Sequence, residues 1–160
     1  MSVGIPGLFP LLVADIGGTN ARFGWISHAG APLTAVELLL CADYSRPEEA
    51  ALDYLNRFQG GLRPARTAIA IASAVSPGPV KVTNSHWVLD RSAFANYIDT
   101  QGVDIFNDFE AIALVLPHLT AADYQLVGAA IPDRQYPMGV IGPGTGLGVA
   151  GVLPLRGQDN

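Results

Sequence analysis

An apolar run near the start of the chain ends in residues that could hold a phosphate. In the stretch "LLVADIGGTNARFGW" the run stops at Asp15 and turns through Gly17, Gly18 and Thr19. Successive backbone N–H groups in such a turn can bind an anion, and a threonine hydroxyl adds a donor. Asp15 could hold Mg²⁺ directly or through water, since magnesium on nucleotides takes one or two carboxylates and several waters. A plain hairpin, in which glycine supplies a positive φ, explains the same residues and stays open.

A second glycine-rich turn, "GPGTG", follows another apolar run and places Thr145 between Gly144 and Gly146. Each turn alone could be a simple connector. Two such turns in one chain favour a magnesium–phosphate cradle with two facing halves. With no lysine near either turn, N–H groups, threonines and a metal ion would have to neutralise the phosphate charge.

The stretch "FNDFEAIAL" places Asn107 and Asp108 where a predicted strand ends and a helix begins. Ligands in α/β sheets gather at the carboxyl ends of strands, so Asp108 is a candidate general base for a sugar hydroxyl that attacks a γ-phosphate. The structural alternative is a capping box, with Asn107 as N-cap and Glu110 three residues on, in which Asp108 only complements the helix dipole. The two roles are compatible.

Several other sites are excluded. A P-loop needs a Gly-Lys pair, and Lys81 follows Val80. The glycines from 142 to 148 lack the G-x-G-x-x-G spacing of dinucleotide folds. The chain has neither the lysine context of protein kinases, nor zinc-ligand spacing, nor a nucleophilic serine elbow.

The elements that must position these residues form a mixed α/β pattern. Apolar runs and turn residues predict strands over 9–16, 21–26, 36–40, 67–73 and 103–106. Helices are predicted to start at Pro47, with Leu52, Leu55 and Phe58 on one face, at the N-cap Asp90, and at Asn107. Further strands are expected near 139–141 and 149–152.

A three-stranded meander followed by alternating helices and strands is typical of the ribonuclease H-like fold of actin-like ATPases. Two copies of that fold normally clasp a nucleotide. We expect one copy, a small N-terminal lobe, over residues 1–118 and the first strands of a larger second lobe over 119–160.

Composition narrows the functional class. The net charge is −5 and Lys81 is the single lysine, which argues against nucleic acid or an anionic membrane as partner. With 49% hydrophobic residues the chain can build a core, and the mean hydropathy of +0.30 suggests surface that something else covers. The lone Cys41 excludes an internal disulfide and suits the cytoplasm. The apolar run over residues 8–14 is too short to span a bilayer, and we expect no membrane partner.

Four motifs, "DIGGTNARFGW", "VTNSHW", "NDFEAIAL" and "GPGTGLGVAG", occur in an order and at spacings that resemble the bacterial glucokinases. These belong to the hexokinase branch of the actin-like ATPases. The resemblance runs from Leu11 to about Val152. Asn20 and Phe109 are more similar to this group than to the repressor-type sugar kinases.

The resemblance implies phosphorylation of glucose at its 6-hydroxyl by ATP with Mg²⁺. Residues on the family's first phosphate motif are Asp15, Ile16, Gly17, Gly18 and Thr19, and those on its second are Gly144, Thr145 and Gly146. Asp108 falls on the catalytic base and Asn107 on its sugar-binding neighbour. Asn84, in a loop that lies near the sugar in the family, is a further candidate, although a turn asparagine explains it too. A homodimer is a further expectation.

The chain ends at Asn160, before the segment that supplies further sugar ligands and before the adenosine pocket of the family. We therefore expect the isolated chain to be inactive or very weak. A kinase for another hexose or an amino sugar remains an alternative, as does a non-catalytic sugar- or nucleotide-binding module.

Overall fold

The computed structural model describes residues 7–128, 133–143 and 147–154. The chain forms two compact units, Met1–Asp108 and Phe109–Asn160. Among the described residues, no helix is both long enough and apolar enough to cross a bilayer.

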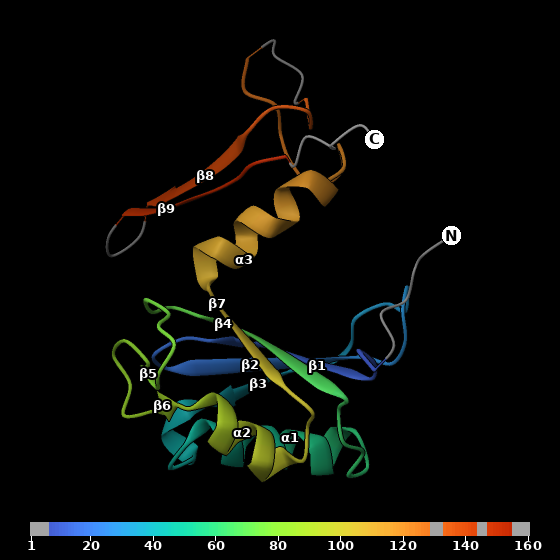
Figure 1. Cartoon of the computed structure of the whole chain (residues 1–160), viewed down its shortest axis with the longest axis vertical. Helices are drawn as coiled ribbons and strands as arrows, with labels where there is room; N and C mark the ends of the chain where they lie inside the picture. The colour runs from blue at the N-terminus through green and yellow to red at the C-terminus, as the bar shows by residue number, and fades with distance from the viewer. Residues whose placement is uncertain (1–6, 129–132, 144–146, 155–160) are drawn as a thin grey trace. The chain divides into compact units, whose positions relative to one another are not determined.

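A mixed sheet of five strands builds the first unit (Figure 1), in the order β3-β2-β1-β4-β7. Its strands are β1 (Leu11–Ile16), β2 (Asn20–Ile26), β3 (Thr34–Leu40), β4 (Arg66–Ile71) and β7 (Val103–Asn107). The first three form the predicted antiparallel meander. Strand β4 runs parallel to β1, and β7 runs parallel to β4. The predicted mixed α/β arrangement is confirmed for this unit.

Two helices, α1 (Pro47–Phe58) and α2 (Arg91–Ile98), lie on the same side of this sheet (Figure 1). Helix α1 begins with Pro47 in its first turn, where the missing N–H costs nothing. Helix α2 has the predicted N-cap, because Asp90 accepts a hydrogen bond of 2.8 Å from the backbone N–H of Ala93.

The core lies between the sheet and the two helices. The largest buried side chain of α1, Tyr54, was missed by the sequence analysis. Tyr54 is fully buried, stacks on Phe23 at 5.5 Å between ring centroids and donates a hydrogen bond to the carbonyl of Ala35. Leu55 is buried as predicted, whereas Leu52 and Phe58 are only partly buried. The Tyr54 side chain determines which face of α1 points into the core, because its ring fills the core while its hydroxyl still finds a hydrogen-bond acceptor.

The opposite face of the sheet carries apolar side chains that are about half exposed. On β3, Val36 is 49% exposed, Leu38 51% and Leu40 48%. Such a face is the kind of surface that the positive mean hydropathy predicts.

A short hairpin that the sequence analysis did not anticipate, β5 (Val80–Lys81) with β6 (Val88–Leu89), presents the "VTNSHW" stretch at its tip. A 3₁₀ turn, η1 (Cys41–Asp43), follows β3. Trp87, at the end of the tip, is fully buried, so the loop is tied to the core.

The second unit contains α3 (Asp108–Val115), the 3₁₀ turn η2 (Leu116–His118) and the hairpin of β8 (Met138–Pro143) and β9 (Leu147–Val152). Helix α3 ends at Val115, and Pro117 lies in the η2 turn that follows it. The Phe109 ring packs on the hairpin where Gly142 and Gly148 face each other. A Cβ at Gly142 would lie 2.5 Å from Phe109 Cζ, and one at Gly148 would also overlap the ring, so a side chain at either position would force Phe109 to move.

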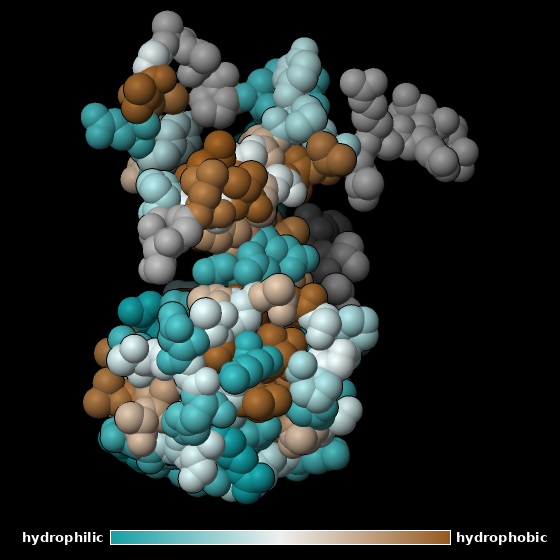
Figure 2. Space-filling view, turned by 90° about the vertical axis from the view of Figure 1, so that its left-hand side faces the viewer, coloured by the Kyte–Doolittle hydropathy of each residue, from teal (hydrophilic) through white to brown (hydrophobic). Residues whose placement is uncertain are grey.

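Because α3 packs on the β8–β9 hairpin, the boundary between the two compact units falls after Asp108 rather than near residue 118. The division of the protein into lobes at 118 stays a prediction. Apolar side chains gather on the second unit in the view of Figure 2, and Ile141 and Leu147 are each 69% exposed.

One buried acid in the first unit affects stability. Glu48, in the first turn of α1, is only 5% exposed, and its Oε2 atom has no hydrogen-bond partner among the described residues. Burial raises the pKa of the Glu48 carboxyl, because the charged form loses its hydration.

We expect Glu48→Gln to become more stable relative to the wild type as the pH rises from 4 to 7. With its pKa raised in the folded state, the carboxyl favours folding below its unfolded pKa, and this contribution is lost as the pH rises through the folded pKa. The relative gain should reach about 1 kcal/mol, the scale of one poorly satisfied buried group. Urea unfolding of both proteins across this pH range measures it. A difference that does not change with pH would contradict the argument.

Candidate active site

Three strand ends lie at one edge of the sheet in the first unit. Ile16 at the end of β1 pairs with Ile71 at the end of β4, and Ile71 pairs with Asn107 at the end of β7. Neighbouring strands are about 4.8 Å apart, so the glycine turn after Ile16 and the Asn107–Asp108 pair are about two strand spacings apart. The predicted position of both motifs at strand ends is therefore confirmed.

The turn between β1 and β2 is a hairpin connection, and it needs glycine for a reason other than backbone conformation. The N–H of Gly17 donates to the carbonyl of Asn20 at 2.9 Å. None of Gly17, Gly18 and Thr19 has a positive φ, so the explanation by backbone conformation is wrong. A Cβ on Gly18 would lie 2.7 Å from the carbonyl oxygen of Thr83 and 2.9 Å from that of Asn84. Gly18 is required because the tip of the β5–β6 hairpin rests against it.

The turn is further fixed by η1. The N–H of Cys41 donates to the carbonyl of Thr19 at 2.8 Å, and its buried thiol donates to the carbonyl of Gly17 at 3.6 Å. Burial raises the pKa of the Cys41 thiol. Ile16 is fully buried and its carbonyl accepts the N–H of Ala72, so its side chain is not available to a ligand.

A cation that the sequence analysis missed lies beside the turn. Arg22 is the cross-strand partner of Asp15, and its Nη1 atom lies 3.1 Å from Asp15 Oδ2. Both side chains are more than half exposed, so the pair adds little to stability. Asp15 and Arg22 line a pocket of about 350 Å³ together with the glycine turn. Phosphate charge next to this turn would therefore meet a guanidinium as well as N–H groups and a threonine.

Ser73 connects the strand-end motifs and was also missed by sequence reasoning. The amide Nδ2 of Asn107 donates to the Ser73 carbonyl at 3.1 Å. The Ser73 hydroxyl accepts the N–H of Thr83 at 2.8 Å and lies 2.9 Å from the Thr83 hydroxyl. Ser73 thereby ties Asn107 to the hairpin that carries Asn84. Its place at the end of a predicted strand was the available signal.

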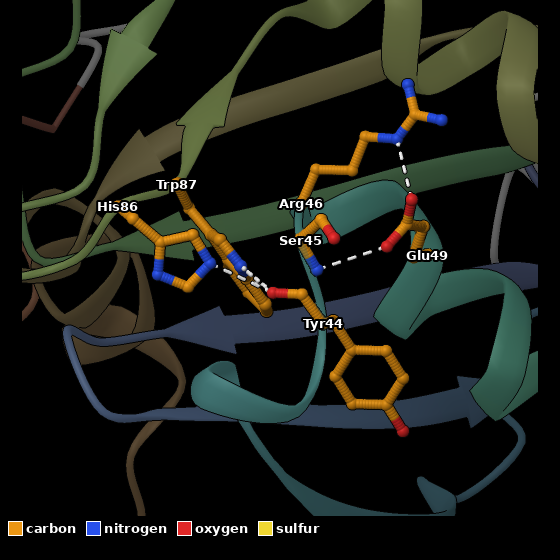
Figure 3. A network of polar contacts seen from close by, with 6 residues as sticks. All are labelled: Tyr44, Ser45, Arg46, Glu49, His86 and Trp87. Carbon is orange, nitrogen blue, oxygen red and sulfur yellow. Dashed lines mark hydrogen bonds and ion pairs between the residues drawn. The ribbon is translucent and has the colours of Figure 1, made fainter.

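The same hairpin is anchored on its other side by a carbonyl (Figure 3). Trp87 Nε1 donates to the Tyr44 carbonyl at 3.0 Å, and His86 Nε2 lies 2.9 Å from the same oxygen. The segment that carries Tyr44 is held in turn by Glu49, whose carboxylate accepts the N–H of Ser45 and contacts the Arg46 guanidinium. Asn84 is exposed and has a φ of +57°, a backbone conformation that asparagine adopts more readily than most residues.

Two parts of the predicted site are still to be placed. Asp108 is the first residue of α3 and is partly buried. Gly144, Thr145 and Gly146 lie outside the described residues.

We expect Gly18→Ala to destabilise the first unit by about 1–3 kcal/mol, because the new methyl group overlaps backbone atoms of the hairpin tip. Gly17→Ala is the matched control: its Cβ would lie 3.6 Å from the Asn20 carbonyl, an ordinary contact, and should change stability by about 0.5 kcal/mol or less. Urea unfolding gives both values, and amide NMR shifts of residues 83–85 report whether the tip moves. Equal effects of the two substitutions would show that the close approach is not the constraint.

Comparison with known proteins adds independent evidence. The sequence model of the glucokinase family matches residues 12–160. A glucokinase of Paramagnetospirillum magneticum is 39% identical over 144 residues, which are 90% of this chain and 44% of that protein. The chain thus spans less than half the length of this relative.

Solved structures agree on the fold. A glucokinase from an Antarctic psychrotroph superimposes with a TM-score of 0.80 at 32% identity, covering 90% of this chain and 46% of that one. A ROK family glucokinase of Streptomyces griseus, solved with glucose and AMPPNP, has a TM-score of 0.63 at 18% identity, covering 90% of this chain and 44% of that one, and so shows the fold alone. The predicted ribonuclease H-like, actin-like kinase fold is confirmed. The chain belongs to the glucokinase family.

Proposed function

We propose that this chain supplies one side of the active site of a glucokinase, which transfers the γ-phosphoryl group of ATP to the 6-hydroxyl of glucose. The observation that carries the proposal is the alignment of β1, β4 and β7, which brings the glycine turn and the Asn107–Asp108 pair to one edge of the sheet. Family membership and a structure of the same fold with glucose and AMPPNP support this choice of substrates.

In this proposal Asp108 is the general base. The 6-hydroxyl oxygen attacks the γ-phosphorus, the bond from that phosphorus to the bridging oxygen breaks, and ADP leaves. The Asp108 carboxylate takes the hydroxyl proton. Most of the remaining catalysis in phosphoryl transfer is positioning and charge neutralisation.

The glycine turn would face the nucleotide phosphates. We assign the phosphate contacts to Gly17, Gly18 and Thr19 and add the Arg22 guanidinium. Arg22 contacts the Oδ2 atom of Asp15, and in this proposal the other carboxylate oxygen, Oδ1, serves a magnesium-bound water. Magnesium, when bound with the nucleotide, would neutralise the phosphate charge; one carboxylate on it fits the way Mg²⁺ binds nucleotides. The described residues contain no cluster of three or more acidic, histidine or cysteine side chains for a metal.

The sugar would lie against Asn107 and Asn84. Ser73 fixes the orientation of the Asn107 amide and, through Thr83, the position of the hairpin tip. We propose that both asparagines contact sugar hydroxyls. The role of Gly144, Thr145 and Gly146 on the nucleotide, the cytoplasmic location, the homodimer and the lack of nucleic-acid or membrane partners stay predictions.

The base assignment is tested in a chimera in which this chain continues into the downstream part of the Paramagnetospirillum magneticum glucokinase. Asp108→Asn should lower kcat by about 10²–10⁴-fold while leaving glucose binding largely intact, because only proton acceptance is lost. Asp104→Asn is the matched control. It removes an exposed carboxylate of the preceding strand β7 whose partner is Arg66, and it should leave kcat nearly unchanged.

Unchanged turnover in Asp108→Asn would exclude Asp108 as the base. A panel of hexoses and amino sugars on the parent chimera separates glucokinase from the alternative sugar kinases. The chain alone, assayed in parallel, should show little or no turnover.

A further inference from the structure

The β5–β6 hairpin directs two side-chain nitrogens at one backbone oxygen, the carbonyl of Tyr44 (Figure 3). Trp87 Nε1 donates at 3.0 Å, and His86 Nε2 lies 2.9 Å from the same atom. A carbonyl oxygen only accepts, so the hydrogen of the neutral His86 ring belongs on Nε2 and the ring is a second donor. The two hydrogen bonds join the hairpin to a residue 42 and 43 positions earlier in the chain.

The two donors differ in what they contribute to the fold. Trp87 is fully buried in the hydrophobic core, so its bond satisfies an indole N–H that has been removed from water. His86 is exposed, and its ring meets the Trp87 ring edge-on at 6.3 Å between centroids. Replacing an exposed side chain leaves the core intact. The His86 bond is therefore explained by what it holds in place.

The oxygen that accepts both bonds is itself held by α1. The Tyr44 hydroxyl donates to Asp53 Oδ2 at 2.7 Å, and Arg57 Nη1 lies 2.9 Å from the same oxygen. The hydrogen bond from Tyr44 lowers the pKa of the Asp53 carboxyl. After the carbonyl, the N–H of Ser45 donates to Glu49 Oε2 at 3.1 Å (Figure 3). The Tyr44 carbonyl is thus a fixed acceptor for the hairpin.

His86 completes the restraints on the tip of the hairpin. Gly18 and Ser73 contact Thr83, the residue before Asn84, and His86 is the second residue after Asn84. The His86 and Asn84 side chains line the same pocket of about 480 Å³ beside the glycine turn. Asn84 therefore has one restraint before it and another after it.

We propose that His86 is a positioning residue: the bond from its Nε2–H to the Tyr44 carbonyl fixes the hairpin tip and thereby the direction of the Asn84 side chain. The restraint on the tip does not depend on the proposed function, but its consequence rests on it, because there Asn84 contacts a sugar hydroxyl. Asp108 is carried by α3, and the glycine turn by β1 and β2. Loss of the His86 N–H therefore weakens glucose binding and leaves the chemical step unchanged.

The restraint is tested in the isotope-labelled chain by backbone NMR order parameters. His86→Phe keeps an aromatic ring beside Trp87 and removes the N–H donor, whereas His86→Gln supplies an amide N–H in its place. At Asn84 and Ser85 we expect order parameters of about 0.85 in the wild type, as in rigid backbone, and a fall toward about 0.6 in His86→Phe. His86→Gln should stay near the wild type. Unchanged values in His86→Phe, an equal fall in His86→Gln, or a tip that is already flexible in the wild type would overturn the proposal.

The consequence is measured in the chimera with the downstream part of the Paramagnetospirillum magneticum glucokinase. His86→Phe should raise KM for glucose about 3–10-fold, the usual effect of one hydrogen bond, while kcat and KM for ATP change by about twofold or less. His86→Gln should retain most of the glucose affinity. His28→Phe is the matched control: His28 is exposed, its Nδ1 lies 3.1 Å from the carbonyl of the next residue, Ala29, and its replacement should leave all three constants unchanged.

The outcomes separate this inference from the proposed function. If the parent chimera phosphorylates glucose but His86→Phe has the KM of the parent, or lowers kcat instead, the proposed function stands and the role of His86 fails. An equal rise in KM in His86→Gln or in His28→Phe would also overturn that role. If the parent chimera does not phosphorylate glucose, the proposed function fails and the sugar role of His86 fails with it, while the order parameters still decide whether His86 holds the tip.

Discussion

The register of the parallel strands β1, β4 and β7 is the constraint on which the candidate site depends. Ala14, Ile69 and Ile105 lie side by side across these strands and are all buried under the helices. A slip of one residue would turn each strand's buried side chains to the opposite face. Burying one isoleucine contributes about 1.5–3 kcal/mol, so a slip is costly. The core thereby fixes where each strand ends, and the strand ends carry the polar residues. The same rows of buried side chains across β1, β4 and β7 therefore set both the stability of the sheet and the geometry of the candidate site.

The hairpin with Asn84 lies outside this sheet and needs its own restraints. Three of them come from different parts of the chain: the backbone of Gly18, the hydroxyl of Ser73 and the carbonyl of Tyr44. Gly18 and Ser73 act on Thr83 and the Tyr44 carbonyl acts on His86 and Trp87, and together they hold a loop that has little secondary structure of its own. A site on loops can be rigid when its supports are buried or belong to the core. Here the buried Trp87 and Ser73 provide that support.

The structural features that depend on residues adjacent in the sequence were predicted from local sequence signals. The ends of β1 at Ile16 and of β7 near Asn107, the proline start of α1 and the Asp90 cap all follow from adjacent residues, and they were found. The contacts that organise the site join residues far apart, such as Asn107 with Ser73 over 34 positions and Trp87 with Tyr44 over 43. No local pattern encodes these pairs. Arg22 was missed for a related reason, since its place beside Asp15 depends on the exact register of the β1–β2 hairpin.

The glycines show how a correct motif can have a different physical cause from the one first assigned. Gly18 carries no positive φ and serves a close approach between two backbones. Gly142 and Gly148 make room for the Phe109 ring. Packing therefore explains these three glycines, and their presence alone is not evidence for phosphate. The proposal of phosphate contacts in the first unit rests instead on the polar groups that line the pockets beside the turn: the Thr19 hydroxyl, the Asp15 carboxylate and two cations, Arg22 in one pocket and Lys81 in the other.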